Sequence, residues 1–259
     1  MIDTHSHLNF KDFANDYVEV WQRAQTAGVG AALVVGSQLE TSRRAMEIAG
    51  ELPDLYAAIG LHPIHATDEN FEIENYRALF TSTPRPVAIG EIGLDYFHHG
   101  KEKFGALQEK ILRQFLALAQ ELNLPCILHC RGAKKDPLTA YDDLLKILAD
   151  YTTTRGVLHC FTADWPTAEK YLARGFYLGF TGVVTFAPEV AAVAAQAPLD
   201  RLLLETDCPY LAPAPRRCER CEPQDVITIA RFIAAARNIS LVKLEMATDR
   251  NARKLFDLS

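Results

Sequence analysis

The sequence predicts an α/β fold of the (β/α)8 TIM-barrel type, in which eight parallel strands each precede a helix. Short β-rich runs alternate eight times with segments of helical periodicity along the 259 residues. The runs are apolar on both faces, which is typical of parallel strands covered by helices. A hydrophobic content of 49% in a chain of this length supplies the core that one such barrel needs.

The expected elements follow one another in a regular order. The first helical segment, residues 17–27, carries apolar Tyr17, Trp21 and Ala24 and ends at Gly28. The clearest helical face consists of Phe104, Leu107, Ile111, Phe115, Leu118 and Leu122, spaced by three or four residues. The expected strands cover residues 1–7, 31–36, 55–62, 87–93, 125–130, 156–161, 176–183 and 201–207. The other expected helices cover residues 39–50, 71–80, 138–149, 167–174, 189–196, 224–237 and 240–255.

An open, doubly wound sheet is the alternative architecture. It is less favoured because no glycine-rich dinucleotide or phosphate loop follows any of the strands. No linker, internal repeat or composition shift marks a second domain, so we expect one domain over residues 1–259.

Imidazoles and carboxylates recur where the expected strands end, the end at which such barrels place their active sites. The first strand ends in His5-Ser6-His7, and two residues that are two apart on a strand point to the same side. The full set of candidate metal ligands is His5, His7, Glu91, His129, His159 and Asp207. Buried groups of this kind are costly unless they are paired or bound to a cation, and six together predict a metal site.

Six ligands exceed the needs of one tetrahedral ion, so we expect two divalent ions that share a bridging carboxylate. Glu91 is the expected bridge. The expected sets are His5, His7, Glu91 and Asp207 around one ion, and Glu91, His129 and His159 around the other. The imidazole content favours zinc, manganese or a similar late first-row ion over magnesium, and the identity stays open.

The chemistry expected of such a site is hydrolysis. A water bridging two ions loses a proton near neutral pH and can attack phosphorus in line with its leaving oxygen. The expected catalytic residues are Asp207, as general base, and Glu91, as metal bridge. Glu205 is expected to interact with a ligating histidine on the side that faces away from the metal. His62 and Arg131 are expected to bind phosphate oxygens of the substrate.

The charge of the chain limits which substrates are expected. The formal net charge is −6, which argues against non-specific coating of duplex nucleic acid. Basic residues are nevertheless expected at the rim of the site, namely Arg131, Lys134, Lys135, Arg216, Arg217 and Arg220. They could guide a single strand, although no aromatic stacking surface is apparent beside them. His65, His98 and His99 fall in expected loops and are interpreted as exposed.

Six segments resemble the signature blocks of the TatD-type metal-dependent hydrolases. They read Asp-Thr-His-Ser-His (3–7), Gly-Leu-His-Pro (60–63), Gly-Glu-Ile-Gly-Leu-Asp-Tyr (90–96), Leu-His-Cys-Arg (128–131), Leu-His-Cys-Phe-Thr (158–162) and Glu-Thr-Asp-Cys-Pro-Tyr-Leu-Ala-Pro (205–213). The resemblance implies an amidohydrolase-like TIM barrel, two divalent metals and deoxyribonuclease activity, often 3′-to-5′. The six candidate ligands fall on the family's metal positions. Two departures are Cys221, where the family has asparagine, and Ala163, where glycine is common.

We therefore expect a divalent-metal-dependent hydrolase, a deoxyribonuclease that cleaves phosphodiester bonds at DNA 3′ ends through a metal-bridging hydroxide. The alternatives are an amidohydrolase or esterase acting on a small or tRNA-linked carbonyl substrate with the same metals, and a non-catalytic nucleic-acid binding module. The absence of an apolar leader or membrane span and the six cysteines predict a cytoplasmic protein with reduced thiols. Cys218 and Cys221 have no second pair to complete a zinc site. A monomer is compatible with the sequence, which leaves the oligomeric state open.

Overall fold

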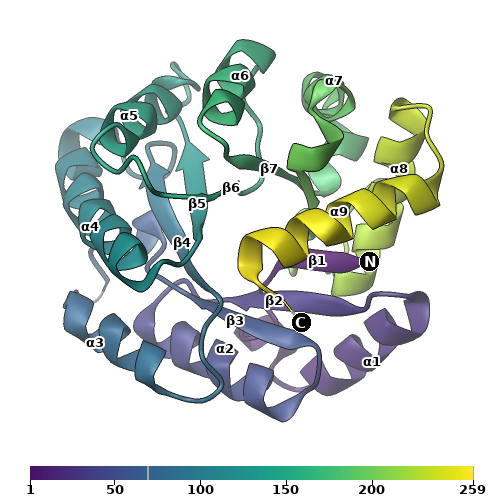
Figure 1. The fold of residues 1–259 in the computed structure, drawn as a ribbon, viewed down its shortest axis with the longest axis horizontal. Coiled ribbons are helices and arrows are strands. Elements are labelled where there is room, and N and C mark those ends of the chain that lie inside the picture. Colours follow the sequence, from purple (N-terminus) through teal and green to yellow (C-terminus); the bar gives the residue numbers. More distant parts are fainter. Residues whose placement is uncertain (69, 259) are drawn as a thin grey trace.

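The computed structural model describes residues 1–68 and 70–258 and confirms the (β/α)8 barrel. Figure 1 shows the strands in the middle of the molecule with the helices arranged around them. The strands form one parallel sheet in chain order, from β1 to β8. They are β1 Ile2–Ser6, β2 Ala31–Val35, β3 Leu55–Ile59, β4 Ala88–Asp95, β5 Cys126–Arg131, β6 Gly156–Leu158, β7 Tyr177–Phe180 and β8 Leu202–Leu204.

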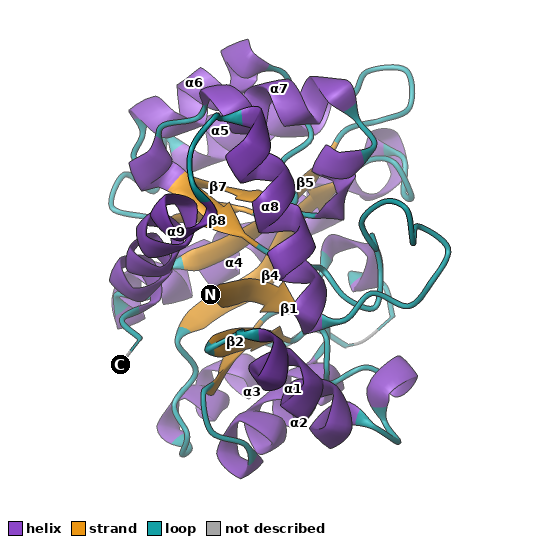
Figure 2. Ribbon diagram, turned by 90° about the vertical axis from the view of Figure 1, so that its right-hand side faces the viewer, coloured by secondary structure: helices purple, strands orange, loops and turns teal. Residues whose placement is uncertain are grey.

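Helices cover the outside of the sheet, and short 3₁₀ turns join several of them to the strands. The α-helices are α1 Tyr17–Ala27, α2 Leu39–Glu51, α3 Ile73–Arg77, α4 Lys101–Leu122, α5 Thr139–Leu148, α6 Trp165–Ala173, α7 Pro188–Gln196, α8 Val226–Ala236 and α9 Leu241–Phe256. Both termini lie at one end of the barrel, and Figure 2 shows the longest loops projecting from the other end. That second end is where the strands terminate, so the loops surround the site.

Side chains of the first strand fasten it to the last. The carboxylate of Asp3 accepts hydrogen bonds from the Thr206 backbone N–H at 2.9 Å and hydroxyl at 2.7 Å. The Thr4 hydroxyl donates to the Leu204 carbonyl at 3.0 Å. These buried contacts close the ring of strands beside the candidate ligands.

The barrel interior holds an apolar layer to which every strand contributes. Its members are Ile2, Ala31, Leu33, Val35, Ala58, Ala88, Ile127, Val157, Tyr177 and Leu203, packed with Ala252, Leu255, Phe256 and Leu258 at the end of the chain. Side chains on a strand alternate in direction, so residues two positions further along also point inward. This periodicity places His129 above Ile127 and His159 above Val157.

β1 and β4 each contain one extra residue relative to the neighbouring strand, in the stretch that holds a candidate ligand. In β1 the paired positions Asp3 and Ser6 are three residues apart, whereas their partners in β2, Ala32 and Val34, are two apart. In β4 the paired positions Ile89 and Ile92 are three residues apart, whereas their partners in β5, Cys126 and Leu128, are two apart. Such bulges redirect side chains and are common beside active sites. Here they turn His5 and Glu91 into the barrel.

Some elements are shorter than the sequence predicts. β6 and β8 each contain three residues, and the helix expected over residues 71–80 is a short α3 followed by a 3₁₀ turn at Ala78–Thr81. His159 and Asp207 therefore lie in the loops after their strands. The chain leaves regular geometry there, because Cys160 and Asp207 have left-handed φ angles of 44° and 58°.

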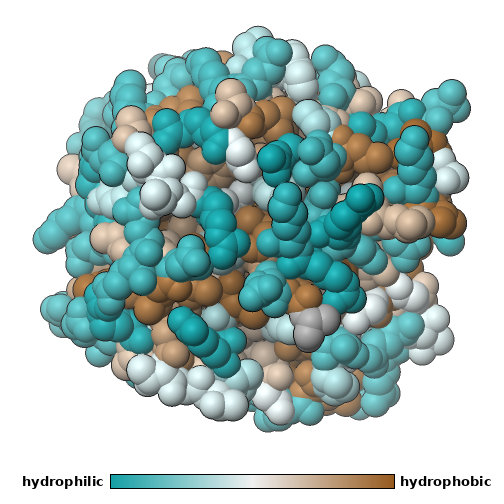
Figure 3. All heavy atoms as spheres, in the orientation of Figure 1, coloured by the Kyte–Doolittle hydropathy of each residue, from teal (hydrophilic) through white to brown (hydrophobic). Residues whose placement is uncertain are grey.

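The outer surface is largely polar. Figure 3, drawn from the same side as Figure 1, shows hydrophilic side chains over most of this face with hydrophobic atoms in scattered patches between them. Within the described residues, no helix has both the length and the apolar character needed to cross a bilayer.

Candidate metal centre

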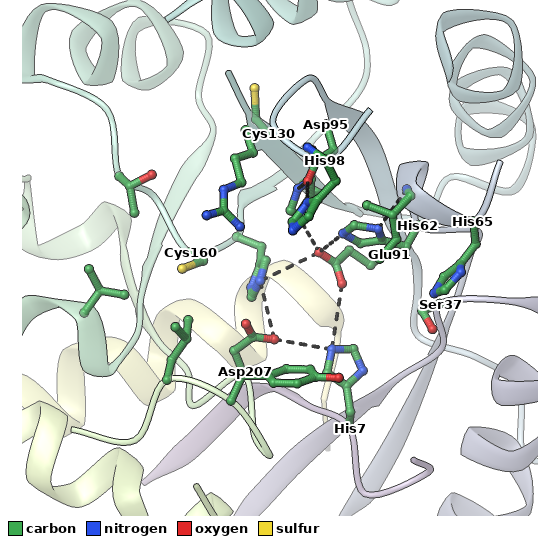
Figure 4. A pocket seen from close by; sticks show the side chains of 18 of the residues that line it. His7, Ser37, His62, His65, Glu91, Asp95, His98, Cys130, Cys160 and Asp207 are labelled. Carbon is green, nitrogen blue, oxygen red and sulfur yellow. Dashed lines mark hydrogen bonds and ion pairs between the residues drawn. The ribbon is translucent and has the colours of Figure 1, made fainter. Parts of the chain in front are cut away.

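A cavity of about 760 Å³ opens at the loop end of the barrel, where the strands terminate. Five of the six candidate ligands form part of its wall, namely His7, Glu91, His129, His159 and Asp207. His5 is completely buried beneath them. Figure 4 shows Glu91 and Asp207 on facing sides of the cavity floor with His7 beside both. The structure thus brings together all six residues that the sequence singles out.

Imidazole nitrogens converge on the two carboxylates. His5 Nε2 lies 3.4 Å from Glu91 Oε2, and His7 Nε2 lies 3.3 Å from Asp207 Oδ1. His5 Nε2 and His7 Nε2 are 3.2 Å apart. His159 Nε2 lies 3.7 Å from Asp207 and 3.8 Å from Glu91, between the two acids.

These separations fit a metal site better than a hydrogen-bonded one. Two atoms that each lie about 2.1 Å from one ion at a tetrahedral angle are about 3.4 Å apart. Most of the distances around Glu91 and Asp207 are close to this value and too long for good hydrogen bonds. The donor atoms of His5, His7 and Asp207 all lie within 4.8 Å of one another, as do those of His62, Glu91 and His129. The residues present can therefore hold divalent metal.

Contacts behind the imidazole rings determine which nitrogen faces the centre. His7 Nδ1 lies 2.8 Å from the Val35 carbonyl, which can only accept a hydrogen bond, so the Nε2 lone pair points inward. His159 Nδ1 lies 3.0 Å from Glu205 Oε1, which likewise leaves Nε2 for the centre. Glu205 lies on the side of His159 that faces away from the centre, a position from which a carboxylate can orient a ligating histidine.

Glycine makes room for that support. A Cβ atom on Gly179 of β7 would lie 2.5 Å from both carboxylate oxygens of Glu205. Glu205 is fully buried, and its Oε1 also accepts a hydrogen bond from the Cys160 backbone N–H. The backbone of β7 and the loop after β6 therefore fix the carboxylate behind His159.

His5 is held by packing. Its ring stacks on that of His159 with centroids 3.6 Å apart, and its Nδ1 is a buried atom without a hydrogen-bond partner among the described residues. Burial, and secondarily the proximity of His159, lower the pKa of His5. A neutral imidazole is the form that binds metal.

Asp95 is the functional candidate that the sequence reasoning missed. It is fully buried at the end of β4, and its Oδ1 accepts hydrogen bonds from the backbone N–H groups of Phe97 and His98. Its Oδ2 lies 3.1 Å from His129 Nε2, while His129 Nδ1 lies 2.9 Å from Glu91. The available signal was an acidic residue ending an apolar strand, two residues after a glycine.

The carboxylates and imidazoles of the centre shift one another's pKa values. Burial alone would raise the pKa of Glu91, but the surrounding imidazoles, chiefly those of His62 and His159, hold that pKa well below its usual range. Burial is similarly outweighed at Asp207, whose pKa is lowered chiefly by His159. Burial lowers the pKa of His159, yet Glu205 and the neighbouring acids raise it to about 10. The site therefore attracts positive charge, which a divalent cation can supply in place of protons.

His62 differs from the four imidazoles of the candidate ligand set. Its Nδ1 accepts a hydrogen bond from the Ile64 backbone N–H at 3.1 Å, so the proton of the neutral ring is on Nε2. That nitrogen lies 3.4 Å from Glu91 Oε1. Burial, followed by the proximity of His129, lowers the pKa of His62 well below its usual range. A neutral ring with an inward N–H can donate a hydrogen bond to a substrate oxygen.

The basic rim is smaller than the sequence predicts. Arg131 lines the cavity, and its guanidinium lies 3.9 Å from the centre of the Phe97 ring. Arg216 instead pairs with Asp225, and Arg220 pairs with Asp16. These two arginines fasten the loop after β8, so they do not extend the basic rim as expected.

Two histidines interpreted as loop residues also line the cavity. His98 Nδ1 lies 2.9 Å from Asp95 Oδ2, and His65 Nδ1 lies 2.7 Å from Asp68. His65 ends the 3₁₀ turn Pro63–His65 after β3, and His98 lies in the loop between β4 and α4.

Cys218 is exposed and Cys221 is buried, both as free thiols.

The chain is similar to known proteins along nearly its whole length. The family model described as TatD related DNase matches residues 2–257. The chain is 38% identical over 261 residues to a protein of Bacillus subtilis named "Uncharacterized metal-dependent hydrolase YabD", with 100% of both chains covered. It is 38% identical over 266 residues to the "3′-5′ ssDNA/RNA exonuclease TatD" of Cronobacter turicensis, covering 99% of this chain and 97% of that protein. The crystal structure of YJJV, a TatD homolog of Escherichia coli, superposes with a TM-score of 0.89 at 31% identity, covering 100% of this chain and 98% of the other.

Proposed function

The chain belongs to the TatD related DNase family of metal-dependent hydrolases, and we propose that it removes nucleotides from the 3′ ends of single-stranded DNA. The observation that carries this proposal is the convergence of imidazole nitrogens on Glu91 and Asp207 at the floor of an open cavity. The name of a similar protein, a 3′-5′ ssDNA/RNA exonuclease, supports the substrate and the polarity. We further propose that residues 1–259 act as one catalytic domain, because the eight strands form a single sheet.

The proposed cofactor is a pair of divalent ions, of zinc, manganese, magnesium or a similar metal. One would be held by His5, His7, Glu91 and Asp207, and the other by Glu91, His129 and His159. Bound ions at these positions would supply Lewis-acid stabilisation of phosphoryl charge and a more acidic attacking water.

Asp207 is proposed to accept the proton of the attacking water. Its Oδ1 faces the imidazoles of His7 and His159, and its lowered pKa keeps it ionised and able to act as a base near neutral pH. The backbone N–H of Asp207 donates to the His5 carbonyl at 2.9 Å, which holds the acid in place despite its left-handed φ.

Two other side chains are proposed to bind the scissile phosphate. His62 presents an N–H to the cavity, and this neutral donor can stabilise a phosphoryl oxygen without repelling the cations. Arg131 lies at the mouth with its guanidinium stacked on Phe97, so its fork of donors is oriented before substrate arrives.

The experiment compares substrates on metal-loaded protein. Single-stranded DNA labelled at the 5′ end should shorten stepwise, and the same strand labelled at the 3′ end should release a labelled mononucleotide at once. RNA of the same sequence, duplex DNA, and a panel of carboxylic esters and lactones are assayed in parallel. The Glu91→Ala variant, purified identically, controls for contaminating nucleases.

The outcomes separate the candidate activities. Release of the 3′ label first, lost in Glu91→Ala, supports the proposal. Turnover of esters or lactones without cleavage of either nucleic acid would replace it with the esterase alternative. Release of the 5′ label first would reverse the proposed polarity.

A further inference from the structure

Two aromatic side chains form one wall of the cavity beside the proposed metal centre. Phe10 and Tyr210 both line it, with ring centroids 6.5 Å apart in an edge-to-face arrangement. The Phe10 ring also stacks on His7, with centroids 4.2 Å apart and an interplanar angle of 13°. No aromatic stacking surface is apparent in the sequence beside the basic residues, and this wall lies elsewhere, formed by two residues that are far apart in the chain.

Backbone hydrogen bonds place this aromatic wall against the proposed metal ligands. The Phe10 N–H donates to the His7 carbonyl at 2.9 Å, and the Tyr210 N–H donates to the Asp207 carbonyl at 3.0 Å. The His7 N–H donates to the Cys208 carbonyl at 2.9 Å and so joins the two turns. Each aromatic residue is therefore tied to the residue three positions earlier that faces the centre.

The wall is accessible to a ligand. Tyr210 is 53% exposed, and the neighbouring Leu211 and Val183 also line the cavity and extend its apolar surface. Phe10 is partly buried between His7 and Tyr210. An open tyrosine ring next to a polar floor offers a flat apolar face within reach of the groups proposed to act on phosphate.

A nucleotide has the matching layout. Its phosphate is anionic and its base is a flat ring, and a sugar joins the two. β1 and β8 are neighbours in the barrel and carry the aromatic wall, while Arg131 ends β5 on the opposite side. A substrate whose phosphate lies over the floor and faces Arg131 can thus place a base against β1 and β8.

We propose that Phe10 and Tyr210 form a subsite for the base of the terminal nucleotide of single-stranded DNA, with the base stacked on Tyr210 and Phe10 supporting it from the side. The inference rests on the proposed function. Stacking of this kind accepts every base, because each base has a π face, so the subsite recognises the nucleotide without selecting its sequence.

The test uses two single-stranded oligonucleotides that differ only in the 3′-terminal nucleotide, which carries a base in one and an abasic tetrahydrofuran in the other. Steady-state removal of this nucleotide is measured for the wild-type protein and for Tyr210→Ala, Tyr210→Leu and Tyr210→Phe. Phe232→Ala, which removes a partly exposed aromatic ring of α8 that does not line the cavity, is the matched control.

Stacking predicts that the wild-type protein prefers the base-containing end by about tenfold in kcat/KM, mainly through KM. Tyr210→Ala and Tyr210→Leu should lose that preference while their cleavage of the abasic end stays at the wild-type rate. Tyr210→Phe should keep the preference, because it keeps the ring. Phe232→Ala should behave like the wild type.

Equal wild-type cleavage of the two ends would overturn the base subsite and leave the proposed function intact. So would an equal loss on both ends in Tyr210→Ala, which would indicate a general effect on the site. Cleavage of neither oligonucleotide by the metal-loaded wild type would instead reject the proposed function, and the subsite with it.

Discussion

Asp95 Oδ2 lies 3.1 Å from His129 Nε2, on the side of the imidazole that faces away from Glu91. The acid is fully buried, and two backbone N–H groups fix its other oxygen. A carboxylate in this position holds the proton on Nε2 and leaves Nδ1 for the proposed metal. It also raises the basicity of the ligand.

We expect Asp95→Asn to weaken divalent-metal affinity by about 10- to 100-fold, because an amide cannot supply the same charge to His129. The measurement is competition with a metal-sensitive dye, so it does not depend on activity. His98→Ala removes the other side chain near Asp95 Oδ2 and is the matched control, expected to change affinity much less. Unchanged metal affinity in Asp95→Asn would show that Asp95 only stabilises the loop after β4, through its hydrogen bonds to the backbone.

Glu91→Ala should abolish hydrolysis and reduce bound metal to less than one ion per chain, because the proposed bridge belongs to both ions. Elemental analysis of protein loaded with manganese or zinc provides the count. Glu47→Ala, on the exposed face of α2, should keep the full metal content. A normal metal content in Glu91→Ala would contradict the bridging assignment.

His62→Ala should lower kcat/KM for DNA by about 10²-fold while the metal content stays at the wild-type value, since its Nε2 carries a proton. Elemental analysis and steady-state kinetics are run on the same preparation. Loss of one ion per chain would instead make His62 a ligand, as its grouping with Glu91 and His129 within 4.8 Å allows.

Arg131→Ala should raise KM for single-stranded DNA and reduce the slope of log(kcat/KM) against log salt by about one unit, because one phosphate contact is lost. Arg131→Lys should restore the slope but only part of the affinity. Lysine keeps the positive charge, but it cannot form the bidentate contact of a guanidinium or stack on Phe97 as arginine does. An unchanged slope in Arg131→Ala would remove Arg131 from the substrate path.

Phe115→Ala should lower the free energy of unfolding by about 3–5 kcal/mol through the cavity it leaves. The ring is fully buried in α4, with its centroid 5.0 Å from that of Tyr76 and 5.4 Å from that of Phe71. Urea denaturation of the metal-free protein measures the change without a contribution from bound ions. Phe232→Ala should cost far less, and an equal loss in the two variants would contradict the packing argument.

Much of the architecture is readable from local pattern. The apolar spacing of Ile111, Phe115 and Leu118 places one face of α4 in the core, and the structure buries all three. The two-residue periodicity of a strand relates His129 to Ile127, so an inward-facing imidazole at the strand end could also be expected. The bulges in β1 and β4 leave no comparable sequence signal, because they depend on the pairing of each strand with its neighbour.

The sequence by itself determined the strand–helix alternation and the residue types at the strand ends, because periodicity and side-chain chemistry are local properties. Only the tertiary structure decided which groups face one another. It placed Asp95 beside His129 and directed the N–H of His62 toward the cavity. It also paired Arg216 and Arg220 with acidic residues and brought Phe10 next to Tyr210. Each of these depends on distances between segments far apart in the chain, and those distances are set by closing the barrel.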